Sequence, residues 1–218
     1  TLHPAMVPPG APRTVAFSPG LTAADGPPVA QRRPALVEDP ASGGAVTQPL
    51  RVAAFVQLGR TKNPTGVGKH INNMVAGLAL TPGVRLEVAA ARDELDAGGA
   101  IPPASGLFGL TPRPLPWRRR TLERSWRLLN WPKIERWCGE VDWVYAPGES
   151  YVATRRARFA GTLHCLMWFE RDKPWGQGRS AQRVRLMMRS ILRPTFKHAR
   201  VIIAVSQFLK SSAVRLFG

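Results

Sequence analysis

One stretch near residue 50 constrains the fold more than any other, because a buried strand there leads directly into a glycine-rich turn and a helix. The apolar run covers residues 52–58, the polar loop after it holds Gly59, Gly66 and Gly68, and helical spacing of apolar residues begins at Ile71. Glycine lets the backbone come close to a ligand, and the free N–H groups at a helix start point at negative charge. This segment therefore predicts an α/β fold that holds an anion at the turn.

Strand and helix patterns alternate over the rest of the chain. Strands are predicted over residues 52–58, 84–91, 142–146, 162–169 and 201–205, and helices over residues 66–80, 180–199 and from 207. Strands that each precede a helix imply a parallel sheet covered on both faces. We therefore expect an α/β fold, a doubly wound, mostly parallel sheet, over residues 49–218. Residues 1–48 are rich in Pro, Ala and Gly with little apolar periodicity, and we expect a disordered tail there.

The charge of the chain is strongly positive and unevenly distributed. The 218 residues include 31 Lys and Arg against 14 Asp and Glu, a net charge of +17, whereas residues 1–50 are balanced. Such a field favours anionic partners such as phosphorylated substrates, an anionic bilayer or nucleic acid. Cys138 and Cys165 fit neither a disulfide framework nor a metal-ligand spacing, so we expect no metal site and a cytoplasmic location. No apolar run is long enough for a membrane-spanning helix.

Two familiar phosphate-binding motifs fail at the glycine turn. A Walker A loop requires glycine where Asn63 stands and Ser or Thr where His70 stands. A dinucleotide fingerprint requires glycine at Ile71 and an acidic residue at the tip of the second strand, although Asp93 lies just beyond that tip. We therefore expect neither ATP hydrolysis nor nicotinamide binding.

The rest of the turn, PTGVGKH over residues 64–70, resembles the opening loop of family 4 glycosyltransferases, the group 1 type with the GT-B fold. The segment GTLHCLMWF, residues 161–169, is similar to that family's T-V-H-D-L strand end. Residues 198–218 are similar to the stretch in which a strand ends in serine, here Ser206, and a helix follows. The resemblance covers roughly residues 51–218. It implies a Rossmann-like N-terminal domain, one half of a GT-B fold.

The resemblance also implies an activity. Family members are retaining enzymes, and we expect a hexosyltransferase that moves a sugar from a nucleotide-sugar donor to a glycan or lipid-linked acceptor, as in polysaccharide biosynthesis, without a further cofactor. Two Rossmann-like domains of such enzymes face each other across a cleft, the first receiving the acceptor and the second holding most of the donor. The chain matches only the first, and the second domain's spaced glutamate pair has no counterpart. We therefore expect the C-terminal donor domain to be missing and these residues alone to be inactive.

The resemblance assigns roles to the glycine turn. The amides of Gly66, Val67 and Gly68 would reach the donor phosphate, where negative charge develops as the nucleoside diphosphate leaves. Lys69 and His70 follow in the first helical turn and are candidates for binding phosphate or acceptor. An ordinary tight turn between a strand and a helix is the alternative.

His164 is the candidate catalytic residue. It lies at the predicted carboxyl end of a strand, the edge at which α/β proteins bind ligands. The resemblance implies a position close to the transferred sugar, where the histidine would orient a hydroxyl or stabilise an oxocarbenium-like transition state. The family commonly has Asp where Cys165 stands, so any orienting help from that carboxylate is lost here. A core histidine bonded to the backbone is the alternative.

Arginines and tryptophans are interspersed over residues 113–137. This composition suits an anionic membrane surface, and the candidates are Trp117, Arg118, Arg119, Arg120 and Trp126. A lipid-linked acceptor would bring such a surface to the inner face of the membrane. Single-stranded nucleic acid also suits it, but no nucleic-acid motif accompanies the charge. A non-catalytic basic module that binds membrane or single-stranded nucleic acid is the alternative function, and a core helix with a solvated basic face is the structural alternative.

Overall fold

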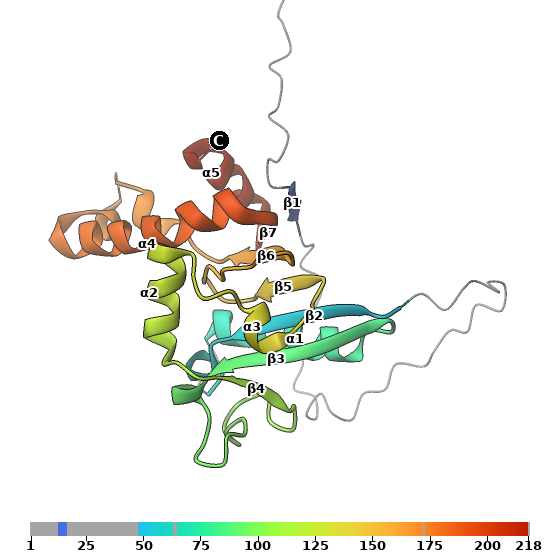
Figure 1. Cartoon of the computed structure of the whole chain (residues 1–218). Helices are drawn as coiled ribbons and strands as arrows, with labels where there is room; N and C mark the ends of the chain where they lie inside the picture. Colours follow the sequence, from blue (N-terminus) through green and yellow to red (C-terminus); the bar gives the residue numbers. More distant parts are fainter. Residues whose placement is uncertain (1–12, 17–47, 63–64, 172, 218) are drawn as a thin grey trace, which may run out of the picture.

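The computed structural model of the chain describes residues 13–16, 48–62, 65–171 and 173–217, which form one seven-stranded sheet flanked by helices (Figure 1). The strands are β1 (Arg13–Ala16), β2 (Leu50–Val56), β3 (Val84–Ala91), β4 (Pro112–Leu115), β5 (Trp143–Ala146), β6 (Arg158–Leu163) and β7 (Ala199–Ala204). The helices are α1 (Gly66–Leu80), α2 (Arg119–Leu129), α3 (Glu135–Cys138), α4 (Gly178–His198) and α5 (Gln207–Phe217). Short 3-10 turns are η2 (Leu58–Arg60), η3 (Arg92–Glu94), η4 (Met167–Phe169) and η5 (Pro174–Gly176).

The strand order is β1-β7-β6-β5-β2-β3-β4, and every neighbouring pair is parallel. From β2 the chain moves outward through β3 to β4, then returns to β5 on the other side of β2 and moves outward through β6 to β7. The direction of winding therefore changes between β2 and β5. At such a switch point the carboxyl ends of the strands leave a crevice, the usual ligand position in this class of fold. The predicted doubly wound parallel sheet is confirmed.

Alternation along β2 divides the core into two layers. Ala54 and Val56 face α1, where they pack with Ile71 and Val75. The intervening Phe55 points to the other face of the sheet, which α2, α3, α4 and α5 cover. Because β2 is central and covered on both faces, both sets of side chains are buried.

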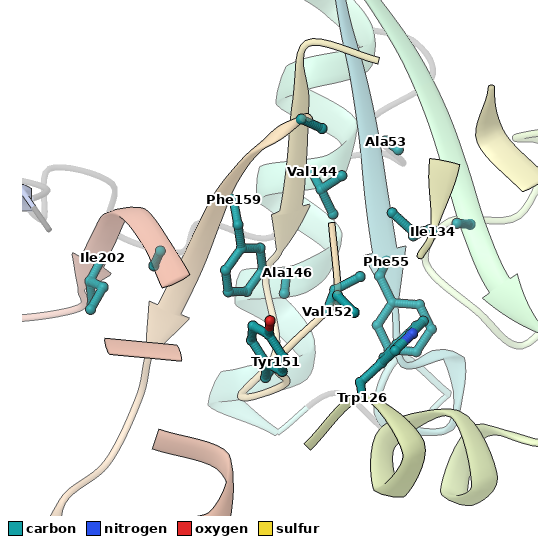
Figure 2. Close-up of a cluster of buried hydrophobic side chains, with 14 of the residues drawn as sticks. Ala53, Phe55, Trp126, Ile134, Val144, Ala146, Tyr151, Val152, Phe159 and Ile202 are labelled. Carbon is teal, nitrogen blue, oxygen red and sulfur yellow. The ribbon is translucent and has the colours of Figure 1, made fainter. Parts of the chain in front are cut away.

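The second layer is built around an aromatic contact between the central strand and α2 (Figure 2). Phe55 and Trp126 meet edge to face with ring centroids 4.9 Å apart, and Trp126 is fully buried. The indole Nε1–H of Trp126 donates to the carbonyl of Pro132 at 2.7 Å. The prediction that Trp126 contributes to a membrane surface is therefore wrong, because this side chain anchors α2 to the sheet.

Two further features bear on the predicted organisation. Strand β1, which was not predicted, lies within the predicted tail and pairs in parallel with β7, so that Thr14 lies beside Ile202. The predictions for residues 1–12 and 17–47 lie outside the described residues. Within the described part of the chain, every helix is too short or too polar to cross a bilayer.

Candidate functional site

The first turn of α1 lies at the carboxyl end of the switch-point strand β2. Thr65 caps the helix, with its Oγ1 accepting the N–H of Gly68 at 3.5 Å and its carbonyl accepting the N–H of Lys69 at 2.9 Å. Gly66 is exposed, and a Cβ atom built there meets no described atom within 4 Å. Val67 is half-buried, whereas Gly68 is buried against the sheet. The exposed start of this turn is therefore open to a ligand.

His164 directly follows β6 at the same edge of the sheet. The prediction of a strand over residues 162–169 is displaced, since β6 ends at Leu163 and the chain turns into η4. The Nε2 of His164 lies 2.7 Å from the carbonyl oxygen of Pro147 in the loop after β5. A carbonyl can only accept, so Nε2 carries the proton. In the neutral ring, Nδ1 is then the hydrogen-bond acceptor.

A carboxylate holds the backbone on which His164 sits. Glu149 Oε1 accepts the N–H of His164 at 3.0 Å and the N–H of Cys165 at 2.8 Å. The carboxylate comes from the loop after β5 rather than from position 165, where the family commonly has Asp. Sequence reasoning missed Glu149, because nothing in its local sequence signals a contact with the neighbouring strand end.

His70 completes the arrangement from the first turn of α1. Its ring meets that of His164 edge to face, with centroids 4.9 Å apart and an interplanar angle of 84°. Its Nε2 is buried and has no hydrogen-bond partner among the described residues. Burial, reinforced by the charge that His164 would carry, lowers the pKa of His70 to about 4. His70 is therefore neutral at physiological pH, and the fold brings two of the predicted site residues into contact.

Lys69 and Cys165, which neighbour the two histidines in the sequence, make fewer contacts in the site. Lys69 is exposed beside the turn. Cys165 is half-buried, with its Sγ 3.4 Å from the N–H of Met167, and burial raises the pKa of its thiol. A raised pKa disfavours the thiolate, so Cys165 is not an activated nucleophile. Within the described residues, no group of three or more His, Cys, Asp or Glu side chains is arranged to hold a metal ion.

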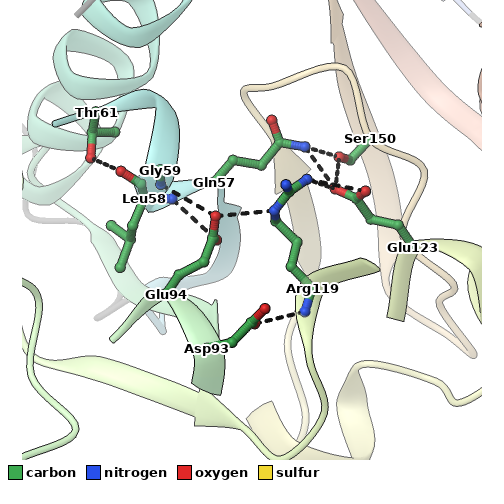
Figure 3. A network of polar contacts seen from close by, with 9 residues as sticks. All are labelled: Gln57, Leu58, Gly59, Thr61, Asp93, Glu94, Arg119, Glu123 and Ser150. Atoms are coloured by element: carbon green, nitrogen blue, oxygen red, sulfur yellow. Dashed lines mark hydrogen bonds and ion pairs between the residues drawn. The ribbon is translucent and has the colours of Figure 1, made fainter. Parts of the chain in front are cut away.

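A polar network lies next to this site and joins the carboxyl ends of three strands to α2 (Figure 3). Gln57, after β2, donates to Ser150 Oγ at 2.5 Å and to Glu123 Oε1 at 2.8 Å. Glu94, after β3, accepts the N–H groups of Leu58 and Gly59, both at 3.2 Å. The network ties the crevice between β2 and β5 to its neighbours, and the sequence analysis did not identify it.

Arg119 is the cation of this network. Its guanidinium lies 3.0 Å from Glu94 and 3.1 Å from Glu123, and its backbone N–H donates to Asp93 at 2.8 Å. Its side chain is 30% exposed, and that of Glu94 is only 10% exposed. The prediction that Arg119 faces a membrane is therefore wrong, because its charge is committed to two carboxylates within the protein.

The other candidates for a membrane surface lie beside the network without joining it. Trp117 is half-buried, with its ring 5.3 Å from that of Trp131. Arg118 and Arg120 are exposed, and neither makes an ion pair within the described residues. They are the two predicted arginines whose charge is available to a partner.

A comparison with protein-family models covers the residues that form this site. The model described as Glycosyltransferase Family 4 matches residues 64–218. The chain belongs to glycosyltransferase family 4. Comparisons with curated proteins and with solved structures gave no match.

Membership of family 4 bears out the resemblance found in the sequence. The matched residues run from the loop before α1 to the end of α5, so they include His70, Glu149 and His164. The parallel sheet agrees with the N-terminal half of a GT-B fold. A family 4 domain binds a nucleotide-sugar donor and an acceptor, which favours the transferase over a non-catalytic basic module.

Proposed function

We propose that this family 4 domain forms the acceptor side of a retaining hexosyltransferase, which moves a sugar from a nucleotide-sugar donor to a glycan or lipid-linked acceptor. The observation that carries the proposal is the contact between His70 and His164, with ring centroids 4.9 Å apart. It brings the turn assigned to the donor phosphate next to the residue assigned to the transferred sugar. Neither motif alone would make such a site.

The first turn of α1 would stabilise the leaving group. As the glycosidic bond to the donor breaks, negative charge grows on the β-phosphate. The free N–H groups of a helix start and the helix dipole attract that charge. Gly66 is exposed and has open space where a side chain would stand, which lets a phosphate approach its backbone and that of Val67. Gly68, buried in the same turn, supports their position.

His164 would act on the acceptor hydroxyl. With Nε2 donating to the carbonyl of Pro147 at 2.7 Å, the unprotonated Nδ1 can accept a hydrogen bond from that hydroxyl and orient it toward the anomeric carbon. No protein nucleophile is invoked, in keeping with a retaining reaction in which the acceptor attacks from the side of the departing diphosphate. Glu149 is a positioning residue, since it holds the backbone of His164 and Cys165.

His70 would keep the site polar without adding a positive charge beside His164. Its low pKa, about 4, makes it neutral at physiological pH. Lys69, which is exposed, would supply a cation at the mouth of the site.

The basic surface near the start of α2 would serve a lipid-linked acceptor. Arg118 and Arg120 are exposed, and the end of the same helix exposes Leu128 and Leu129, at 77% and 70%. Exposed cations and apolar side chains on one helix suit peripheral contact with an anionic leaflet, here the inner face of the membrane. On this proposal, transfer needs a second, donor-binding domain, and residues 49–218 alone would bind an acceptor without turnover.

The proposal is tested by sugar transfer in an enzyme that joins these residues to a donor-binding domain. A panel of UDP- and GDP-hexoses is incubated with the enzyme, and release of the nucleoside diphosphate is measured with and without candidate glycan and lipid-linked acceptors. His164→Ala should reduce transfer by about 100-fold or more, the scale of a lost proton-transfer or hydroxyl-orienting group. His198→Ala is the control, because His198 lies at the end of α4, away from the site.

The stereochemistry of the product supplies the second readout. Proton NMR of the new glycoside should show the same anomeric configuration as the donor sugar. Inversion would contradict the retaining route, and unchanged turnover in His164→Ala would mean that the histidine is only structural.

A further inference from the structure

The amino ends of the strands, opposite the transfer site, enclose a second site. A cavity of about 910 Å³ lies where β2, β5 and β6 begin and beside α3. Along β6 the six-residue step from Arg158 to His164 corresponds to about 20 Å of extended chain, so the two sites are well separated. The charged residues around the cavity are Arg51, Lys133, Glu135, Arg136, Glu140, Asp142, Arg155, Arg156 and Arg158.

The three carboxylates at this cavity are already engaged by the protein. Glu140 and Asp142 each lie 3.7 Å from the guanidinium of Arg51, and Asp142 also accepts the N–H of Arg51 at 2.8 Å. The other five cations around the cavity form no ion pair within the described residues. Positive charge is therefore left over, which favours an anionic occupant.

Glu135 uses its carboxylate to hold the loop that carries two of those cations. Its Oε1 accepts the N–H groups of Arg155, Arg156 and Ala157 at 2.6, 3.0 and 3.1 Å. Three successive N–H groups on one oxygen fix the backbone of the loop. The side chains of Arg155 and Arg156 are thus presented from a rigid support, and both are exposed.

Aromatic surface and further cations extend the site. The guanidinium of Arg158 lies 5.7 Å from the ring centroid of Trp143, a cation–π contact that orients it at the wall of the cavity. Trp131, 47% exposed, stands on another wall. An adjoining hollow of about 530 Å³ is lined by Trp143, Arg158 and Arg200. Arg200 is the extra residue at the irregularity between β6 and β7, where Phe159 and Ala160 pair with Ala199 and Val201.

We propose that this cavity binds a phosphate-bearing ligand at a site distinct from the transfer site. Guanidinium groups bind phosphate through paired N–H donors, and five arginines line this cavity against three carboxylates. The phosphate can belong to a soluble compound or to the headgroup of an anionic phospholipid. The inference does not depend on the transfer reaction, since none of its residues belongs to that site.

The test is calorimetric titration of the full chain with inorganic pyrophosphate, alongside sedimentation with vesicles of phosphatidylcholine alone or mixed with phosphatidylglycerol. The variant Arg155→Ala/Arg156→Ala/Arg158→Ala removes three exposed cations of the cavity. The matched control, Arg183→Ala/Arg189→Ala/Arg193→Ala, removes three exposed arginines from α4 and the same net charge. Thermal unfolding by circular dichroism checks that both variants fold.

We expect the cavity variant to bind at least one of the two probes about tenfold or more weakly, the loss of about 1.4 kcal/mol expected for removed charge-assisted contacts, and the control to bind within about twofold of the parent. A loss confined to pyrophosphate identifies a soluble ligand, and a loss confined to the anionic vesicles identifies a lipid headgroup. Equal losses in both variants, or binding of neither probe by the parent, would overturn the proposal. The binding test needs no sugar transfer, and in the enzyme joined to a donor-binding domain the same three substitutions should leave transfer unchanged, so this result is independent of the proposed function.

Discussion

The imidazole rings of His70 and His164 meet edge to face, with centroids 4.9 Å apart. One ring belongs to the first turn of α1 and the other to the loop that follows β6. The contact spans the switch point of the sheet, because β5 lies between β2 and β6. The loop after β5 supplies the carbonyl of Pro147 and the carboxylate of Glu149, which hold His164. A donor-side motif and an acceptor-side motif thereby become parts of one site.

The buried histidine should make stability depend on pH. In the unfolded chain His70 takes up a proton near its ordinary pKa of 6.5, whereas in the folded protein it does so only near pH 4. Between these values the unfolded state binds more protons, so the free energy of unfolding falls as the pH drops from about 6.5 to about 4. Urea denaturation at a series of pH values should show a shallower fall in His70→Gln. The control His198→Gln should retain the part of the pH dependence that comes from His70. Identical pH profiles of unfolding free energy for the parent and His70→Gln would contradict the prediction.

The open space at Gly66 should be occupied by the donor and not by protein. Gly66→Ala places a methyl group where no described atom lies within 4 Å, so folding should be unaffected or slightly favoured. A phosphate that approaches this backbone would meet the methyl group, and the donor KM should rise about tenfold, or about 1.4 kcal/mol. Gly77→Ala is the control, since Gly77 lies in the same helix with equally open surroundings. Equal donor KM values in the two variants would contradict the proposal that the donor phosphate binds at this turn.

Arg119 should matter for stability far more than its neighbour in the same arginine run. Arg119→Leu leaves the largely buried Glu94 and the half-buried Glu123 without their cation, which should cost about 1–3 kcal/mol of unfolding free energy. Arg120→Leu, at an exposed position, should stay within about 0.5 kcal/mol. Urea denaturation measures both. Similar losses in the two variants would mean that the network contributes little.

Trp126 should be a principal anchor of α2. Trp126→Ala empties a fully buried volume against Phe55 and removes the hydrogen bond to Pro132, so the cost should be about 3–5 kcal/mol. Leu128→Ala, two positions along the helix and 77% exposed, should change stability by less than about 0.5 kcal/mol. If chemical denaturation gives the two variants similar losses of unfolding free energy, the packing of Trp126 against the sheet does not contribute much to stability.

Local patterns predicted the elements around the site well. The apolar run of β2, the glycine turn and the spacing of Ile71 and Val75 identify a strand, a loop and a helix from neighbouring residues alone. The end of β6 was displaced, because TLHCLMWF is apolar throughout and apolar content does not separate a strand from the turn that follows it.

The arginine and tryptophan run was harder to interpret. Arg118, Arg119 and Arg120 are identical side chains in sequence, yet among the described residues only Arg119 pairs with carboxylates, because α2 starts beside Glu94 in the turn after β3. Amino-acid composition cannot distinguish which of the three forms ion pairs within the protein. The position of the helix on the sheet decides which of them faces the carboxylates.

The sequence by itself determined the alternation of strands and helices, the glycine turn and the family, because these depend on residues close together along the chain. The order of the strands was decided only by the tertiary structure, since that order depends on packing between distant segments. That order brings His164 beside His70, lets Glu149 hold the backbone of His164 and gathers Gln57, Glu94 and Arg119 at one edge. It also gathers the arginines of the cavity at the opposite edge, since the starts of parallel strands meet there.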